Sequence, residues 1–470
     1  MSKFFIATAI DYVNGRPHVG HAFEKVIADV VARYRRLKGD DVWFTTGTDD
    51  NAMKNVQAAE AAGVPVGPYV DGSSHRFVKL CERLGIEYDK FARTFDPNHF
   101  AVCQNAFGKI RGSGAIYPGE YEGLYCQGCE SFLTEKDLIG GKCPEHEVEP
   151  VPTKEKCYFF DLERYRDVIE KFVHERVFPA TRANEMLSRL RDPLQPLCVS
   201  RPNKGWGISV PDDPSQTVYV WFDALLNYLS AAHTYFPPDM HVIGKGITWF
   251  HAVVWPAMLA AAGLELPRRV VVHGYLNTAG KKISKTAENS IDPFDLLDKY
   301  GRDAVRYSLA RCSTFEDSDY SEALLVDRYN KELANNFGNL ISRVSAMASK
   351  SDLTGDPPFN KLYAKLDRVG YMTAMNECAV DKALQALLTF ANDCNAYIDL
   401  HKPWEAGKTD KLRDLTDAVR ALVIYLSPFL PDGMITASAC MGFPLTFDAV
   451  DEPLANVKMK VPPLYERIRA

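Results

Sequence analysis

FFIATAIDYVNGRPHVGH, residues 4–21, places an apolar run directly before a short motif of histidines and glycine. The run Phe4–Ile10 reads as a buried β-strand, and an Asn-Gly pair after it favours a turn. His18 and His21 lie where this strand passes into a helix, and Gly20 lets the backbone come close to a ligand. Because the N-terminus of a helix favours negative charge, the stretch predicts an anion site at the end of a strand.

The residues that follow extend this pattern. Apolar side chains recur at helical spacing from His21 to Lys38, and Gly39 stops the helix. Asp41–Thr46 reads as the next strand. A strand, a crossover helix and a second strand imply a parallel sheet, which binds its ligands at the carboxyl ends of the strands.

A second motif, KISKT at residues 282–286, follows another apolar run, Val270–Leu276. A loop carrying Lys282 and Lys285 is a mobile source of positive charge. Displacement at an α-phosphate needs alignment and neutralisation of charge, with Mg²⁺ bridging the leaving pyrophosphate. Two imidazoles and two ammonium groups on one phosphate chain therefore predict nucleotidyl transfer from ATP. The alternative is that the histidines are core or capping residues. The predicted catalytic residues are His18, His21, Lys282 and Lys285.

The composition is that of an ordinary globular protein of about three domains, with 470 residues, 46% of them hydrophobic and 25% charged. The chain has no run of about 18 apolar residues and no pattern of a cleavable signal, so we expect no membrane span. Its eleven scattered cysteines favour cytosolic thiols and a cytoplasmic location. A net charge of −6 does not exclude RNA, because RNA binding needs only a local basic track.

The pattern changes along the chain and predicts a divided architecture. Short strand-like pieces with cysteines and glycines replace the alternation between about 117 and 210, which indicates an insertion. Thr217–Phe222 and Met240–Ile243 read as strands that resume the sheet, and helical spacing prevails from Ser321, as in a helical bundle. The predicted domains are the first catalytic half at 1–115, the inserted domain at 116–212, the second catalytic half at 213–270, a linker with the lysine loop at 271–322, and the helical domain at 323–470.

The insertion carries a candidate metal site. A CxxC pair is followed after thirteen residues by CxxH, which is the spacing of a structural Cys₃His zinc knuckle. Four protein ligands leave no open position, so one structural Zn²⁺ is predicted. The alternative is two unrelated cysteine pairs beside an exposed histidine. The predicted ligands are Cys126, Cys129, Cys143 and His146.

Several motifs together resemble one family. The two ATP motifs resemble those of class I aminoacyl-tRNA synthetases. The further motifs GTD at 47–49, YVWFDA at 219–224, IGK at 243–245, FH at 250–251, WP at 255–256 and HGY at 273–275 are similar to the methionyl-tRNA synthetase family along the whole chain. The resemblance implies an α/β fold. A Rossmann-like parallel-sheet catalytic domain would be split by an inserted zinc-knuckle domain and followed by an all-α helical-bundle domain.

The resemblance also implies an activity. Methionine would be activated by ATP, with Mg²⁺, to methionyl-adenylate and transferred to the 3′ end of tRNA(Met), by a chain expected to be a monomer. Two alternatives stay open: a class I synthetase for another amino acid, which would lack the aromatic pocket, and a non-catalytic tRNA-binding paralogue, which would lose His21 or Lys285.

Three sets of residues match the family's binding positions. The implied ATP-binding residues are His18, Gly20, His21, Gly244, Lys245, His273, Leu276, Lys282, Ser284 and Lys285. The implied methionine-binding residues are Ile10, Tyr12, Asp49, Trp221, Ala224, Leu225, Tyr228, Phe250 and His251. Aromatic faces suit a polarizable thioether, an acid pairs with the ammonium group, and a polar hydrogen from His251 with Tyr228 would face the sulfur. The implied anticodon-binding residues are Asn339, Arg343, Asp399, Pro403 and Trp404, with the indole as a stacking platform.

Some positions depart from the family pattern. Asp50-Asn51-Ala52 stands where an acid, a histidine and a glycine are usual, and Gly246 stands where an acid would contact the ATP ribose. Asp11 is also unusual, while Ile283 and Thr286 replace the commoner methionine and serine. These changes indicate an active but divergent member, because both histidines, both lysines and Asp49 are present.

Overall fold

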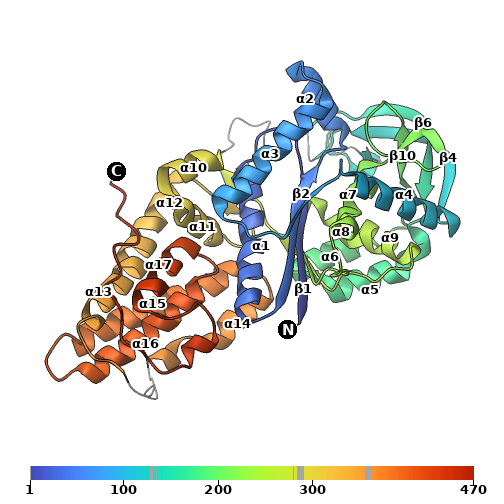
Figure 1. Cartoon of the computed structure of the whole chain (residues 1–470). Helices are drawn as coiled ribbons and strands as arrows, with labels where there is room; N and C mark the ends of the chain where they lie inside the picture. The colour runs from blue at the N-terminus through green and yellow to red at the C-terminus, as the bar shows by residue number, and fades with distance from the viewer. Residues whose placement is uncertain are drawn as a thin grey trace.

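The structure is a computed structural model, and it describes residues 2–126, 131–133, 135–144, 147–278, 280–282, 291–354 and 362–469. A parallel sheet lies in the middle of the molecule, with the helical part on one side and the insertion on the other (Figure 1). The six strands assigned within these ranges, in spatial order, are β3 (Lys90–Arg93), β2 (Asp41–Asp49), β1 (Lys3–Tyr12), β12 (Met240–Gly244), β13 (Val270–His273) and β7 (Val177–Phe178).

Every pairing in this sheet is parallel, which confirms the expectation from the first strand and its crossover helix. The strand order reverses between β1 and β12. Open α/β sheets bind ligands at such a switch point, outside the carboxyl ends of the strands. The helices that follow the first strands are α1 (Val19–Leu37), α2 (Met53–Ala62), α3 (Val66–Leu84) and α4 (Pro97–Gly112).

Strand β1 shows why the sheet is buried on both faces. Phe4 and Ile6 pack into the core that contains α1, whereas Phe5 and Ala7 pack into a second core on the opposite face. Successive side chains of a strand point to opposite faces, so a continuous apolar run fits a strand covered on both sides. The second core includes α4, α5 (Arg166–Arg176) and α9 (Trp255–Ala261).

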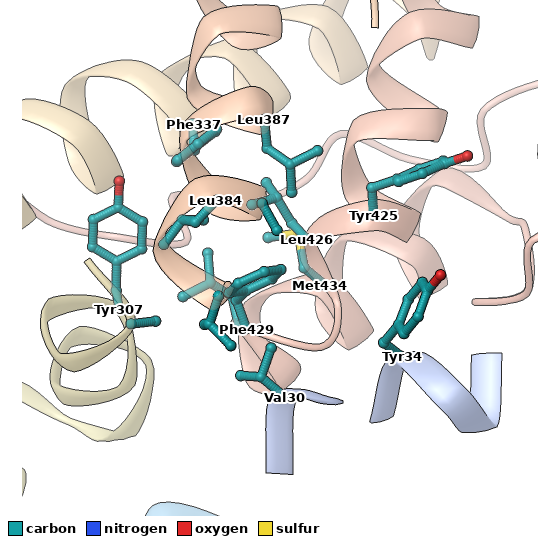
Figure 2. Packing of buried hydrophobic residues seen from close by; sticks show 14 of the residues in the cluster. Val30, Tyr34, Tyr307, Phe337, Leu384, Leu387, Tyr425, Leu426, Phe429 and Met434 are labelled. Carbon is teal, nitrogen blue, oxygen red and sulfur yellow. The ribbon is translucent and has the colours of Figure 1, made fainter. Parts of the chain in front are cut away.

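The helical part packs directly on α1. In Figure 2, Val30 and Tyr34 of α1 point toward Phe429 and Tyr425 of the bundle. One continuous core therefore joins the sheet domain to the bundle. The helical elements are α10 (Pro293–Tyr300), α11 (Arg302–Ala310), α12 (Glu322–Arg328), a π-helical segment η5 (Tyr329–Gly338), α13 (Asn339–Ala348), α14 (Arg368–Asn376), α15 (Val380–His401), α16 (Thr409–Leu426) and α17 (Pro431–Met441).

The insertion folds as two small antiparallel sheets beside the central sheet. One has the order β5 (Ser131–Leu133), β4 (Ile116–Cys126), β6 (Val151–Phe160) and β8 (Leu197–Cys198). The other has the order β10 (Ser209–Val210), β11 (Asp213–Val218) and β9 (Ser200–Pro202). Between β6 and β8 the chain forms α5, β7 and α6 (Ala180–Arg189), and β7 joins the central sheet beside β13. The domain boundaries stay predictions.

The prediction of a sheet strand at Thr217–Phe222 was wrong. The strand β11 ends at Val218 and pairs antiparallel with β9 and β10 rather than with the central sheet. The next residues form α7 (Val220–Leu225), followed by α8 (Asn227–Ser230). Buried aromatic residues mark a segment packed on two sides, and a short apolar run is the same for a strand and for a buried helix.

No helix within the described ranges has the length and the apolar character that crossing a membrane requires.

Candidate functional site

The predicted site residues gather at the carboxyl ends of four neighbouring strands. Tyr12 ends β1 and lies opposite Asp49, which ends β2. Gly244 ends β12 and lies opposite His273, which ends β13. The structure thus places Tyr12 and Asp49, from the predicted methionine set, on one side of the switch point between β1 and β12, and Gly244 and His273, from the predicted ATP set, on the other side.

His18 and His21 form the cap of α1. His18 Nδ1 accepts a hydrogen bond from the Gly20 N–H at 3.1 Å, and His21 Nδ1 accepts one from the His18 N–H at 3.0 Å. The two rings lie with centroids 3.8 Å apart. Because both Nδ1 atoms are acceptors, the hydrogen of each neutral ring is on Nε2. A Cβ on Gly20 would lie 2.9 Å from the His18 ring, so this close packing requires glycine.

The unusual Asp11 is neutralised by a buried cation. Lys25 on α1 is fully buried and pairs with Asp11 at 2.5 Å, while the other Asp11 oxygen lies 3.9 Å from His21 Nε2. Burial opposes the charged form of Lys25, but Asp11 and Glu24 outweigh it and raise the lysine pKa. The carboxylate beside His21 therefore brings little net negative charge to the site.

His273 links the end of β13 to α1. Its Nε2 lies 3.1 Å from Glu24 Oε2, and its Nδ1 lies 2.7 Å from the Gly274 carbonyl oxygen. The ring also makes an edge contact with Phe23, with centroids 5.5 Å apart. Both ring nitrogens of His273 thus face acceptor oxygens, which fixes the orientation of the ring between β13 and α1.

The described residues that flank the lysine loop belong to strand β15 and to the segment that starts at Ile291. Lys282 lies in β15 (Lys281–Lys282), which pairs with β14 (Leu276–Thr278). Where the described chain resumes, the Ile291 carbonyl accepts a hydrogen bond from the Val19 N–H at 3.1 Å, directly after His18. Ser284 and Lys285 lie outside the described residues, and of Lys282 only the backbone is described. Leu276 is buried in β14.

At Gly246, one of the positions that depart from the family pattern, a neighbouring side chain leaves no room for a Cβ. A Cβ at this position would collide with the Tyr275 hydroxyl, so any side chain here needs Tyr275 to move. Lys245 next to it pairs with Asp317 at 2.7 Å and lies 4.8 Å from the centroid of the Tyr275 ring. The Tyr275 hydroxyl thus occupies the space that a side chain at position 246 would take.

An aromatic wall forms most of the predicted methionine pocket. Trp221 of α7 stacks on Phe250 with ring centroids 3.9 Å apart and an interplanar angle of 4°. Tyr12 meets the Trp221 ring edge-on at 6.2 Å. Ala224 and Leu225 are buried on the same short helix, and Ile10 is half-buried two residues before the end of β1.

Tyr228 and His251 form the polar part of this wall. The His251 Nδ1–H donates to the Ile247 carbonyl at 3.0 Å, so its Nε2 is the acceptor for the Tyr228 hydroxyl at 2.8 Å. Burial lowers the pKa of His251 to about 4 and keeps the ring neutral. The polar hydrogen expected to face the sulfur is thus already used between these two side chains.

A buried polar network that the sequence reading missed lies behind the pocket. Asp223 accepts hydrogen bonds from Asn51 Nδ2 at 2.8 Å and from His99 Nε2 at 2.6 Å. His99 Nδ1 is 2.8 Å from the Ser230 hydroxyl. The signal for it was present, because Asp223 is an acid inside an otherwise apolar run.

His99, Cys103 and Asp223 group their ligand atoms within 4.8 Å of one another, but they do not fit a metal ion. A tetrahedral zinc with bonds of about 2.0–2.1 Å holds its ligands about 3.3 Å apart. The His99–Asp223 distance of 2.6 Å is that of a hydrogen bond. Burial and the Asp223 carboxylate also raise the pKa of the Cys103 thiol well above its usual value.

Two of the four predicted zinc ligands are described. Cys126 ends β4 and is 1% exposed, and Cys143 is fully buried, although most residues around them in the insertion are exposed. The Cys143 backbone closes a turn, with its N–H bonded to the Val148 carbonyl at 2.9 Å. A buried thiol at the end of β4 and a second buried thiol outside the sheet fit a metal-centred core. Cys129 and His146 lie outside the described residues.

The predicted anticodon residues are far from this site, in the bundle. Asn339 and Arg343 are both exposed on α13, and Asp399 is exposed near the end of α15. Trp404 is 54% exposed and follows buried Pro403 just after that helix. The Trp404 side chain is thus largely open to solvent at the surface of the bundle.

Comparison with known families agrees with this architecture. The family described as "tRNA synthetases class I (M)" matches residues 4–151 and 146–345. The parallel sheet, with a histidine cap after its first strand, and this match define a class I aminoacyl-tRNA synthetase.

Similarity to individual proteins identifies the family within this class. The chain is 38% identical to the methionine–tRNA ligase of Thermotoga maritima, over 92% of this chain and 74% of that protein. It is 36% identical to that of Thermosynechococcus vestitus, over 96% and 92%. The solved Mycobacterium tuberculosis methionyl-tRNA synthetase in complex with methionyl-adenylate is 34% identical, with a TM-score of 0.93 and coverage of 99% of this chain and 100% of that chain. The chain belongs to the methionine–tRNA ligase family.

Proposed function

We propose that this chain activates methionine with ATP as methionyl-adenylate and transfers the methionyl group to the 3′ end of tRNA(Met). The observation that carries this proposal is the meeting of a histidine-capped helix and an aromatic pocket at one switch point of the sheet. Membership of the methionine–tRNA ligase family supports it, as does the likeness to a relative solved with methionyl-adenylate.

For the phosphates, we propose that His18 and His21 donate through their Nε2 atoms. The hydrogen bonds that fix both Nδ1 atoms support this orientation. The N-terminal dipole of α1 adds to the favourable field for an anion. Lys282 and Lys285 would supply further positive charge from the loop that begins at β15, and Mg²⁺ would neutralise the leaving pyrophosphate. Gly20, Gly244, Lys245, His273, Leu276 and Ser284 complete the proposed ATP set.

For methionine, we propose that Asp49 pairs with the ammonium group and that the Tyr12–Trp221–Phe250 wall packs against the thioether. Aromatic faces and edges make favourable contacts with sulfur, which supports selection of methionine over an aliphatic chain. A hydrogen bond from Tyr228 to the sulfur would require the tyrosine to leave His251, so shape and aromatic contact carry most of the proposed selectivity. Ile10, Ala224 and Leu225 complete the lining.

For tRNA, we propose that Trp404 stacks on an unstacked anticodon base and that Asn339 and Arg343 hydrogen-bond base edges. The exposure of all three supports this assignment. Asp399 and Pro403 would position the Trp404 segment. We also propose a structural Zn²⁺ at Cys126, Cys129, Cys143 and His146, and a cytoplasmic monomer.

Amino-acid-dependent ATP–pyrophosphate exchange tests the proposal. Exchange should depend on methionine, and leucine, valine and cysteine at equal concentration should support it at least about a hundredfold less. A synthetase for another amino acid would exchange best with that amino acid. A non-catalytic tRNA-binding paralogue would show no exchange with any of them, and either result would overturn the proposal.

A further inference from the structure

Asn51 lies between the two elements that carry the methionine pocket. Its backbone N–H is 3.2 Å from Asp49 Oδ1, the carboxylate proposed to hold the substrate ammonium. Its side-chain Nδ2 donates to Asp223 Oδ2 at 2.8 Å, and Asp223 lies on α7 between Trp221 and Ala224. One side chain therefore joins the end of β2 to the helix that bears the aromatic wall.

The orientation of the Asn51 amide is settled by its neighbours. The same Nδ2 also donates to the Thr94 backbone carbonyl at 2.9 Å. Both partners of this atom are acceptors, so the NH₂ group must face them and Oδ1 must face the other way.

Oδ1 of Asn51 is left buried without a hydrogen-bond partner among the described residues. Asn51 is 6% exposed and Asp49 is 2% exposed, so both are buried where strand β2 ends. A buried acceptor without a donor costs free energy, and a ligand that brings a donor recovers it.

We propose that Asn51 Oδ1 accepts a hydrogen bond from the ammonium group of the bound amino acid, beside the Asp49 carboxylate. This inference rests on the proposed function, because it takes Asp49 as the ammonium partner. An ammonium group has three hydrogens and needs more than one acceptor when it leaves water.

The charges around Asn51 favour a cation at this place. Asp50 is already paired with Arg93 at 2.8 Å, and Asp223 is paired with His99 at 2.6 Å. Asp49 accepts from neutral groups, the Asn51 N–H and the Thr94 hydroxyl at 3.3 Å. A ligand ammonium group beside Asp49 would therefore meet a carboxylate and an amide oxygen together.

A pair of ligands that differ only in the ammonium group tests the proposal. L-methioninol carries the ammonium group, and 4-(methylsulfanyl)butan-1-ol lacks it. Dissociation constants would be measured by calorimetry on the full chain, with the weaker ligand measured by competition against the stronger one. The variants are Asn51→Ala and, as matched control, Cys103→Ala, whose thiol touches Asp223 on the side of His99. Asn51→Ser serves if Asn51→Ala does not fold.

The proposal predicts that Asn51→Ala weakens methioninol about tenfold or more while the alcohol without nitrogen changes less than about threefold. Cys103→Ala should leave the ratio of the two constants unchanged. An equal loss for both ligands in Asn51→Ala would make Asn51 purely structural and overturn the proposal, as would no change for either. Failure of the proposed function would appear differently, as a wild-type chain without methionine-dependent exchange.

Discussion

His18 combines two roles at the residue scale. Its side chain caps α1 by accepting the Gly20 N–H, and its Nε2 is assigned to the phosphates in our proposal. A cap and a catalytic group in the same ring have different chemical requirements, since capping needs only an acceptor near the backbone. Substitutions that preserve one role and remove the other can therefore separate them.

His18→Asn should keep the cap and lose the imidazole. We expect adenylate formation to fall by about 10²–10³ in both His18→Asn and His18→Ala, because the ring acts mainly in the transition state. Only the alanine variant should lose about 1 kcal/mol of unfolding free energy. Pyrophosphate exchange and urea unfolding measure the two effects. A rate in His18→Asn close to wild type would show that the ring serves only as a cap.

The low pKa of His251 predicts how the free energy of unfolding depends on pH. Its pKa of about 4 in the folded chain lies below the usual value, so the unfolded chain binds the proton more readily between pH 6.5 and 4. The free energy of unfolding must therefore decrease as the pH falls through this range, by about 2 kcal/mol between pH 7 and pH 5. Urea unfolding of His251→Gln should lack this part of the decrease. The exposed His174→Gln is the matched control, and an equal pH dependence in all three chains would contradict the burial of His251.

The sequence predicted which residues belong to the site better than it predicted their hydrogen-bond and ion-pair partners. The histidine motif and the aromatic residues follow from short patterns, because their spacing relative to a strand is local. The Asn51–Asp223–His99 network joins residues 124 and 172 positions apart, and a single sequence does not state which distant groups meet.

At the scale of elements, the long periodic helices and the apolar strands were predicted correctly. The helix expected over His21–Lys38 is α1 at Val19–Leu37, and the strand expected from Phe4 is β1. The segment Thr217–Phe222 was read as a strand because its aromatic residues are buried. It splits into the end of β11 and the start of α7 because Trp221 and Asp223 must face the pocket and the network behind it.

The insertion yields a prediction for its metal. Cys126→Ser should release one zinc per chain and loosen the sheet of β4 and β6, because ligand binding and folding are coupled in such sites. Cys157→Ser is the matched control, since this buried thiol of β6 lies in the same sheet outside the knuckle. Metal content by mass spectrometry should be one zinc in wild type and in Cys157→Ser. Zinc retained in Cys126→Ser, or absent from wild type, would contradict the assignment.

At the scale of the whole molecule, a buried arginine holds the sheet domain and the bundle together. Arg306 of α11 is fully buried, pairs with Asp29 of α1 at 2.7 Å and donates to the Phe429 and Pro428 carbonyls of the bundle. Burial opposes ionisation of Asp29, but Arg306 and Arg33 outweigh it and lower its pKa. The bundle is therefore anchored to the helix that begins at His18.

The proposed anticodon site should affect tRNA charging but not amino-acid activation. Trp404→Ala removes the proposed stacking platform, which should cost about 1–3 kcal/mol, or roughly tenfold to a hundredfold in tRNA charging. Pyrophosphate exchange should remain within about twofold, because Trp404 lies in the bundle away from the sheet edge. Val369→Ala, another exposed apolar residue of the bundle, should alter neither reaction. A parallel fall in both reactions would identify Trp404 as a structural residue.

The overall architecture was predictable because the periodicity changes along the chain. What was not predictable is how the parts meet, such as the contribution of β7 from the insertion to the central sheet. A strand of two residues has no periodic signal, and its place follows only from packing against β13.

The most direct test of the central claim is to isolate the intermediate. The wild-type chain, mixed with α-labelled ATP, Mg²⁺ and methionine, should hold about one methionyl-adenylate per chain, and leucine should give none. Addition of tRNA(Met) should discharge it to methionyl-tRNA and AMP. A chain that releases no pyrophosphate and forms no adenylate with methionine, or forms one equally well with leucine, would contradict the account.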